Sequence, residues 1–244
     1  MKRTTALTII LLFSLSSFCQ SHRNEPAPKI TVKWAPTGLI LGNVNVQAEY
    51  NFGGKHSLTA NLGIPSSAHH SFNYQDGKTD FNMKSTSFLA GYRTYTSHKQ
   101  LAGFYLEPYF KYVHQLSEGI GNGTLSSQPA TFDFTNDYNG MGVGLQLGTQ
   151  FIIKKRIIVD LFFLGPEINS SENTFKAIEI NNSTPWTSME ATEAQKDIVD
   201  FLNQFPIIRN HTNVMVDKSS RVVTADFSGF VPGIRAGVSI GIAF

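Results

Sequence analysis

The residues whose types could support catalysis lie in or beside the polar stretches of the chain. A nucleophile activated by a nearby base, with an acid to assist, would indicate a hydrolytic or transfer enzyme. The candidates are His69, His70, His114 and His211, with Ser66, Ser67, Asp76 and Ser117 nearby in the sequence. No spacing among them is diagnostic of such a site. The sequence therefore predicts no catalytic residues and a protein that is not an enzyme.

The sequence also gives little support to a metal, cofactor or nucleic-acid site. His69 and His70 are adjacent, but no third ligand follows at a recognisable interval, which favours a solvated loop. Glycine-rich stretches such as Asn122-Gly123-Thr124 lack a phosphate-loop pattern. Lysine and arginine are dispersed among acidic residues at a net charge of +2, so there is no concentrated basic face. We expect no metal, no cofactor and no nucleic-acid partner.

The N-terminus has the pattern of a secretory signal peptide. A basic start precedes a short apolar run that ends in small residues, and the run is too short to cross a bilayer as a helix. We predict a signal peptide over 1–19, cleaved after Cys19, and a periplasmic segment over 20–29. Lipidation of Cys19 stays open as the alternative, although Phe18 stands where lipoprotein signals favour a small residue.

The remainder of the chain alternates apolar and polar residues with a period of two. Charged residues make up only 16% of the 244 residues, against about 25% in ordinary soluble domains. Strands with one apolar and one polar face are typical of a barrel that meets lipid outside and a polar lumen inside. The candidate strands are 30–36, 44–52, 57–64, 87–96, 103–113, 140–152, 157–165 and 230–244. They predict an all-β fold, an eight-stranded antiparallel transmembrane barrel over 30–244.

The connections between these strands alternate between short and long. Tight turns are expected at 53–56, 97–102 and 153–156. Longer connections, of about 20 residues before Ser87 and about 23 before Tyr138, alternate with them, and the last is a long outer loop at about 169–228. Short periplasmic turns and long extracellular loops are the arrangement of outer-membrane barrels.

The polar faces of the strands carry ionisable residues, which a soluble barrel would point outward. If this face lines the lumen, its charges must pair, because side chains fill the interior of so narrow a barrel. Three acids and four bases form the predicted lumen network: Lys33, Glu49, Arg93, Glu107, Lys111, Asp160 and Arg235. Small residues on one strand, Gly140, Gly142, Gly144 and Gly148, leave room for large partners opposite. We expect a plugged polar lumen.

The C-terminal strand ends with an alternating apolar pattern. Val238, Ile240, Ile242 and Phe244 lie on one face, and this pattern resembles the signal by which the barrel-assembly machinery recognises outer-membrane proteins. The segments AEYNF at 48–52 and GYRTY at 91–95 resemble those of a family of small outer-membrane barrels known only as a domain of unknown function. Barrels of the OmpA and OmpX kind are the nearest architectural relatives. The resemblance implies the bacterial outer membrane, with its lipid and lipopolysaccharide as partners, and it transfers no catalytic residues.

A helical period occurs within the last loop, over 188–204. Its apolar stripe consists of Ile198, Phe201, Leu202 and Phe205. Thr187 or Ser188 is expected to cap the start, and Pro206 to end the helix. One interpretation is a helix packed on the barrel rim or over its mouth, and the other is a contact site for a surface partner.

Three functions fit these observations. The first is a non-enzymatic outer-membrane barrel whose outer loops act in envelope integrity or bind an unidentified surface ligand. The second is a narrow pore, and the third, which we favour least, is a lipid A-modifying enzyme.

Overall fold

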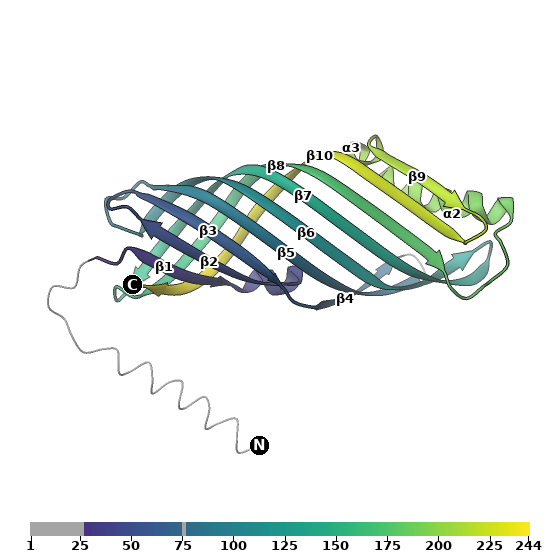
Figure 1. Ribbon diagram of the computed structural model, residues 1–244, viewed down its shortest axis with the longest axis horizontal. Helices are drawn as coiled ribbons and strands as arrows, with labels where there is room; N and C mark the ends of the chain where they lie inside the picture. The colour runs from purple at the N-terminus through teal and green to yellow at the C-terminus, as the bar shows by residue number, and fades with distance from the viewer. Residues whose placement is uncertain (1–26, 75–76) are drawn as a thin grey trace, which may run out of the picture.

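Eight strands form a closed antiparallel ring in the computed structural model, which describes residues 27–74 and 77–244 (Figure 1). The ring order is β1-β2-β3-β5-β6-β7-β8-β10, and β10 pairs with β1 to close it. β4 lies beside β5, and β9 lies beside β10. The predicted fold class is therefore confirmed. The predicted signal peptide over 1–19, with Cys19, lies outside the described residues.

The elements follow one another with few interruptions. In chain order they are β1 (Ile30–Ala35), η1 (Pro36–Leu41), β2 (Asn43–Asn51), β3 (His56–Pro65), β4 (Ala68–Tyr74), β5 (Gly77–Tyr95), β6 (Gly103–Leu125), β7 (Gln128–Ile153), β8 (Ile157–Glu179), α2 (Ser188–Leu202), α3 (Pro206–Arg209), β9 (Thr212–Asp217) and β10 (Val222–Ala243). No helix in the described part of the chain is long and apolar enough to cross a membrane.

The outer connections differ from the predicted loops. The stretch before Tyr138 is strand, because β6 and β7 pair without interruption up to a two-residue turn at Ser126 and Ser127. Both turn residues have positive φ angles, 48° and 61°, as in the tight turns of hairpins. The region predicted as one long loop at about 169–228 is also strand at both ends. β8 extends to Glu179 and β10 begins at Val222, because the two strands pair in register up to that point.

The C-terminal end of the barrel has an apolar outer surface. Side chains that point outward there are large and exposed, whereas their neighbours in each strand point inward and are mostly polar. The exposed apolar residues are Ile30, Val32 and Trp34 in β1, Val46 and Tyr50 in β2, Leu58, Leu62 and Ile64 in β3, Phe88 and Tyr92 in β5, Phe104, Leu106 and Phe110 in β6, Met141, Val143, Leu145, Leu147 and Phe151 in β7, Ile157, Leu161, Phe163, Leu164 and Ile168 in β8, and Phe230, Ile234, Ile240 and Ile242 in β10. The polar faces therefore line the lumen.

The opposite end, which we call the outer extension, has a hydrophobic core of its own. Its members are Leu125, Ala130, Trp186, Ala191, Ala194 and Val223, with Phe132, Ile198, Val214 and Val216 packed against them. α2, α3 and β9 all lie at this end, far from the C-terminus (Figure 1). The helix predicted over 188–204 is thus present as α2, and it packs against β9 and against parts of β6 and β10.

The buried face of α2 differs from the predicted stripe. Ala191, Ala194 and Leu202 are buried, whereas Phe201 and Phe205 are 44% and 46% exposed. The small alanine side chains allow α2 to approach the strands closely. The aromatic side chains are too large for the face of α2 that contacts the strands. The helix begins with a capping box between Thr187 and Glu190, in which each side chain accepts a hydrogen bond from the other residue's backbone.

Candidate functional site

A buried cluster of charges crosses the lumen near the tight turns at the C-terminal end of the barrel. Lys33 Nζ donates to Glu49 Oε2 at 3.0 Å and to Asp160 Oδ2 at 2.7 Å. Arg93 donates from Nη2 to Glu107 Oε2 at 2.7 Å and from Nη1 to Asp160 Oδ2 at 2.9 Å. All five side chains have an exposed fraction of 0%. We call these five residues the charge plug.

Neutral donors complete the charge plug, which holds two cations and three carboxylates. Tyr95 donates to Glu49 at 2.6 Å, and Tyr105 donates to Asp160 at 2.7 Å. Thr59 donates to Glu107, and Gln150 Oε1 accepts from Lys33 at 2.7 Å. Charges removed from water are tolerated only when such partners satisfy them. The excess carboxylate is therefore accommodated by hydroxyl groups.

Glycines on β7 make room for the tyrosines of β6. A Cβ atom at Gly148 would lie 2.3 Å from the ring of Tyr105, and one at Gly144 would lie 2.4 Å from Tyr109. No real side chain approaches a ring so closely. The aromatic rings thus occupy the space that the absent side chains leave, as the sequence predicted.

Two members of the predicted lumen network lie outside the charge plug. Lys111 pairs with Glu167, a residue that the sequence analysis did not include. Arg235 donates from Nη1 to Gln146 Oε1 at 2.6 Å and lies over the ring of Phe162, 4.7 Å from its centroid. Within the described part of the chain, no carboxylate forms an ion pair with Arg235.

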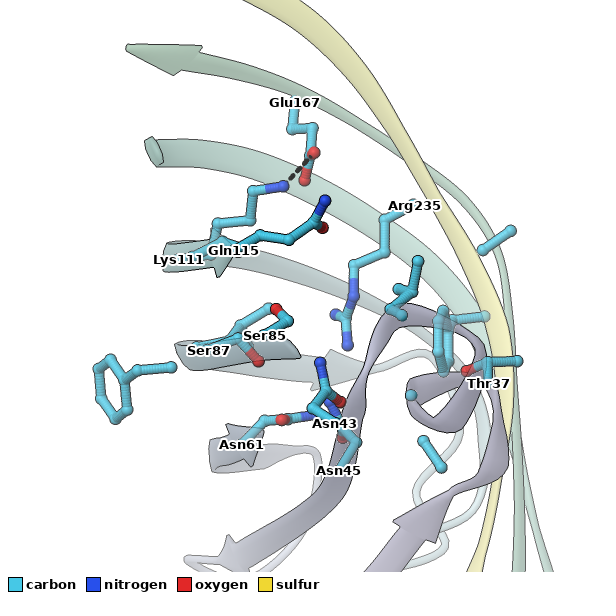
Figure 2. A pocket seen from close by; sticks show the side chains of 18 of the residues that line it. Thr37, Asn43, Asn45, Asn61, Ser85, Ser87, Lys111, Gln115, Glu167 and Arg235 are labelled. Atoms are coloured by element: carbon cyan, nitrogen blue, oxygen red, sulfur yellow. Dashed lines mark hydrogen bonds and ion pairs between the residues drawn. The ribbon is translucent and has the colours of Figure 1, made fainter. Parts of the chain in front are cut away.

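A cavity of about 270 Å³ lies beside these two cations. Figure 2 shows Arg235, Lys111 and Gln115 pointing into it together with Asn43 and other side chains of β2, β3 and β5. The Oδ1 atoms of Asn43 and Asn45 are buried without a hydrogen-bond partner among the described residues. The polar groups that face the cavity are therefore those of Arg235, Lys111, Gln115 and the neighbouring side chains.

The histidines considered for catalysis do not converge. His69 contacts Asn82 at 3.4 Å, His70 contacts the Ile40 carbonyl at 2.9 Å, and His114 contacts Asp137 at 3.0 Å. These three contacts lie at exposed positions. Ser117 lies on β6, the strand of His114, but is buried, whereas the His114 contact is exposed. His211 lies beside β10 in the outer extension, and Asp76 lies outside the described residues. In the described ranges, no three histidine, cysteine or acidic residues could hold a metal together.

A second buried ion pair holds the outer extension together. Arg221 Nε donates to Glu179 Oε2 at 3.0 Å, and Trp186 Nε1 donates to the same oxygen at 2.7 Å. Arg221 also donates to the Thr184 carbonyl at 2.6 Å. These contacts join the end of β8, the start of β10 and the segment before α2. Sequence reasoning missed this pair because both residues lay in the region predicted as a loop.

Comparisons with known proteins give a distant similarity of fold. No protein-family model matches the chain, and no curated protein matches it. The solved structures that resemble it include those of CarO2 and CarO from Acinetobacter baumannii. CarO2 is 11% identical with a TM-score of 0.46, and the match covers 91% of this chain and 100% of that one. CarO is 10% identical with a TM-score of 0.41, and the match has the same coverage.

Proposed function

We propose that this chain is a non-enzymatic outer-membrane β-barrel whose lumen is closed to ions. In this proposal its outer extension acts at the cell surface, in envelope integrity or in binding a surface ligand. The charge plug is the observation that carries the proposal. Five charged side chains with no exposed surface interlock across the lumen, and in this proposal they block the passage of water and ions.

The apolar outer surface supports the location. Side chains as large as Phe104 and Ile234 are 60% and 77% exposed on the ring, where only a lipid environment makes such exposure favourable. Export would use the signal peptide over 1–19. Assembly would use the C-terminal pattern of Val238, Ile240, Ile242 and Phe244, read by the barrel-assembly machinery, with lipid and lipopolysaccharide around the barrel.

The outer extension supports a role in binding. It has its own hydrophobic core and the buried pair of Glu179 and Arg221, so it is a folded platform and not a set of loose loops. Large apolar side chains remain exposed on it, among them Met189 at 69% and Ile207 at 55%. Such groups are typical of surfaces that contact other molecules.

The location is tested by gel mobility. Protein from washed outer membranes is compared before and after boiling, because a folded barrel resists detergent and migrates differently until it is boiled. We expect a mobility shift in the membrane fraction. A soluble protein without a shift would contradict the location and the orientation of the strands in lipid.

The closed lumen is tested by conductance in planar bilayers. The wild-type protein is expected to pass almost no current, because the charge plug fills the lumen. Replacement of Lys99, an exposed residue of a periplasmic turn, by Met should leave the current unchanged. A large steady current from the wild-type barrel would overturn the closed-lumen proposal and favour the narrow pore.

A further inference from the structure

The wall of the barrel is not continuous beside β10. β1 pairs with β10 only from Thr31↔Ala243 to Trp34↔Ile240. β9 pairs with the same side of β10 only at Val222–Phe227. Between these two pairings, residues 228–239 of β10 have no strand on that side. We call this stretch the free edge.

The backbone groups of the free edge can be assigned from its two ends. The Phe244 amide donates to Ile30, on the β1 side, and the Ser228 amide donates to His211, on the same side. Even-numbered amides of β10 therefore point toward the free edge. Pro232 is even-numbered and has no N–H group, so it occupies a position where no ladder partner is needed. In lipid, the remaining unpaired groups would be costly.

The short helix η1 lies beside the part of the free edge that is nearer to the C-terminus, where Thr37 is next to Gly237. Leu39, Ile40 and Leu41 are exposed on its outer side, and Ile40 is 64% exposed. The hydrogen bonds of η1 and of the following residue, Gly42, are made to other segments than β10. The Ile40 carbonyl accepts from His70, and the Gly42 carbonyl accepts from the amides of Ser66 and Ser85. Among the described residues, no hydrogen bond joins η1 to β10. The junction between η1 and the free edge is therefore a contact without backbone pairing.

The cavity in the lumen lies directly behind this junction. Its lining includes Ile234 and Ala236 from the free edge, Thr37 and Leu41 from η1, and the unpaired cation Arg235 between them (Figure 2). The charge plug separates the cavity from the periplasmic turns. The cavity therefore has a lining of both polar and apolar residues and one cation that no carboxylate of the described residues neutralises, and the free edge lies next to it.

We propose that this cavity binds the head group of a single-chain anionic amphiphile such as a fatty acid. The carboxylate accepts hydrogen bonds from Arg235, and the acyl chain passes between η1 and the free edge into the bilayer. A volume of about 270 Å³ is at the lower limit for small-molecule pockets, so it accommodates a head group and leaves the chain outside. The apolar residues of η1 then contact the chain, which covers part of the free edge.

The test uses the full-length protein in phosphatidylcholine nanodiscs at pH 8. The probe is dodecanoic acid with a photoreactive diazirine near the end of its chain, and its methyl ester is the neutral control. We expect cross-links to residues 37–41 and 230–238, and about tenfold or more weaker labelling by the ester, because a charge-assisted hydrogen bond is lost.

The variant Arg235→Gln should reduce labelling by the acid to a similar degree, and Arg235→Lys should restore part of it. Arg209→Gln, at a cation of the outer extension, is the matched control and should label as the wild type does. Retention of the gel mobility shift will show that each variant is folded. Hydrogen exchange of the amides between 230 and 238 should slow when the acid is present.

Two outcomes would overturn the proposal. One is labelling that is equal in Arg235→Gln or with the ester, since the probe would then report only the lipid-facing surface. The other is a dimer in which these amides are already protected without any probe, since a second copy of the chain would then occupy the free edge.

Discussion

Arg93 lies at the centre of the charge plug. It contacts Glu49, Glu107 and Asp160 with one guanidinium group, and it stacks on Tyr105 with 3.7 Å between its Cζ atom and the ring centroid. The planar guanidinium, with five donors, contacts all three carboxylates at once, whereas the Lys33 ammonium contacts two of them. The stability of the lumen therefore depends on this residue more than on Lys33.

Replacing Arg93 by Met is expected to destabilise the barrel strongly. Three carboxylates would then share Lys33 as their only cation in a space without water, and breaking a buried ion pair costs about 3–5 kcal/mol. The urea midpoint of unfolding from lipid vesicles, followed by the fluorescence of Trp34 in a Trp186→Phe background, measures the effect. Lys99→Met is the control. An unchanged midpoint for Arg93→Met would mean that the carboxylates take up protons at no cost.

Replacing Gly148 by Ala tests the packing of the tyrosines. The added methyl group would lie 2.3 Å from Tyr105, which would have to move away from Asp160. Overpacking of this kind costs about 1–3 kcal/mol. The matched control is Gly123→Ala, where a Cβ atom meets nothing within 4 Å. Equal urea midpoints for the two variants would contradict this account of the lumen.

At the scale of elements, the strands were predictable only in the part of the barrel whose outer surface is apolar. There the alternation is strict, with apolar residues outside. In the outer extension the apolar residues of the alternation lie inside and the polar residues lie outside. Phe132 and Phe134 of β7 point inward, whereas Asp133 points outward into water. The alternation is still present in the sequence, and it is the signal that could have extended the strands.

The partner of Lys111 was missed for a different reason. β8 contains one extra residue relative to β10, because Arg235 pairs with Gly165 and Gly237 with Phe162. This bulge changes which face each later residue of β8 occupies, and it turns Glu167 inward. A strict period of two places Glu167 outside. The charge plug was accessible to sequence reasoning because all of its residues lie in the regular part of the strands.

The capping box of α2 is expected to respond to acid. Hydrogen bonds from the hydroxyl and the backbone amide of Thr187 lower the pKa of Glu190 below its ordinary value of 4.5. A carboxylate with a lowered pKa stabilises the folded helix end above pH 4.5, and this contribution is lost as pH falls through the folded pKa. NMR titration of the Glu190 carboxyl and of the first-turn amides measures it. In Glu190→Gln these amides should no longer follow that titration.

At the scale of the whole molecule, the interior is layered. The charge plug lies at one end, the cavity beside Lys111 and Arg235 follows it, and the hydrophobic core with Trp186 lies at the other end. No residue of the charge plug belongs to the outer extension. The two ends therefore have separate sources of stability.

Replacing residues 180–220 by a two-residue Asn-Gly turn tests this separation. The ring strands and the charge plug remain, so the variant should insert into membranes and retain its gel mobility shift, while any surface ligand is lost. Arg221→Met is the control. It keeps every other residue but removes the pair with Glu179, so proteolysis between 180 and 221 should accelerate without loss of the mobility shift. Failure of both variants to fold would contradict the separation.

The charge plug contains no residue of β10, and this bears on how the barrel closes. Lys33 and Asp160 meet across the lumen, from β1 and β8, although β10 lies between those two strands in the ring. The charge plug therefore needs no side chain from β10, the strand whose short pairing with β1, from Thr31 to Trp34, closes the ring.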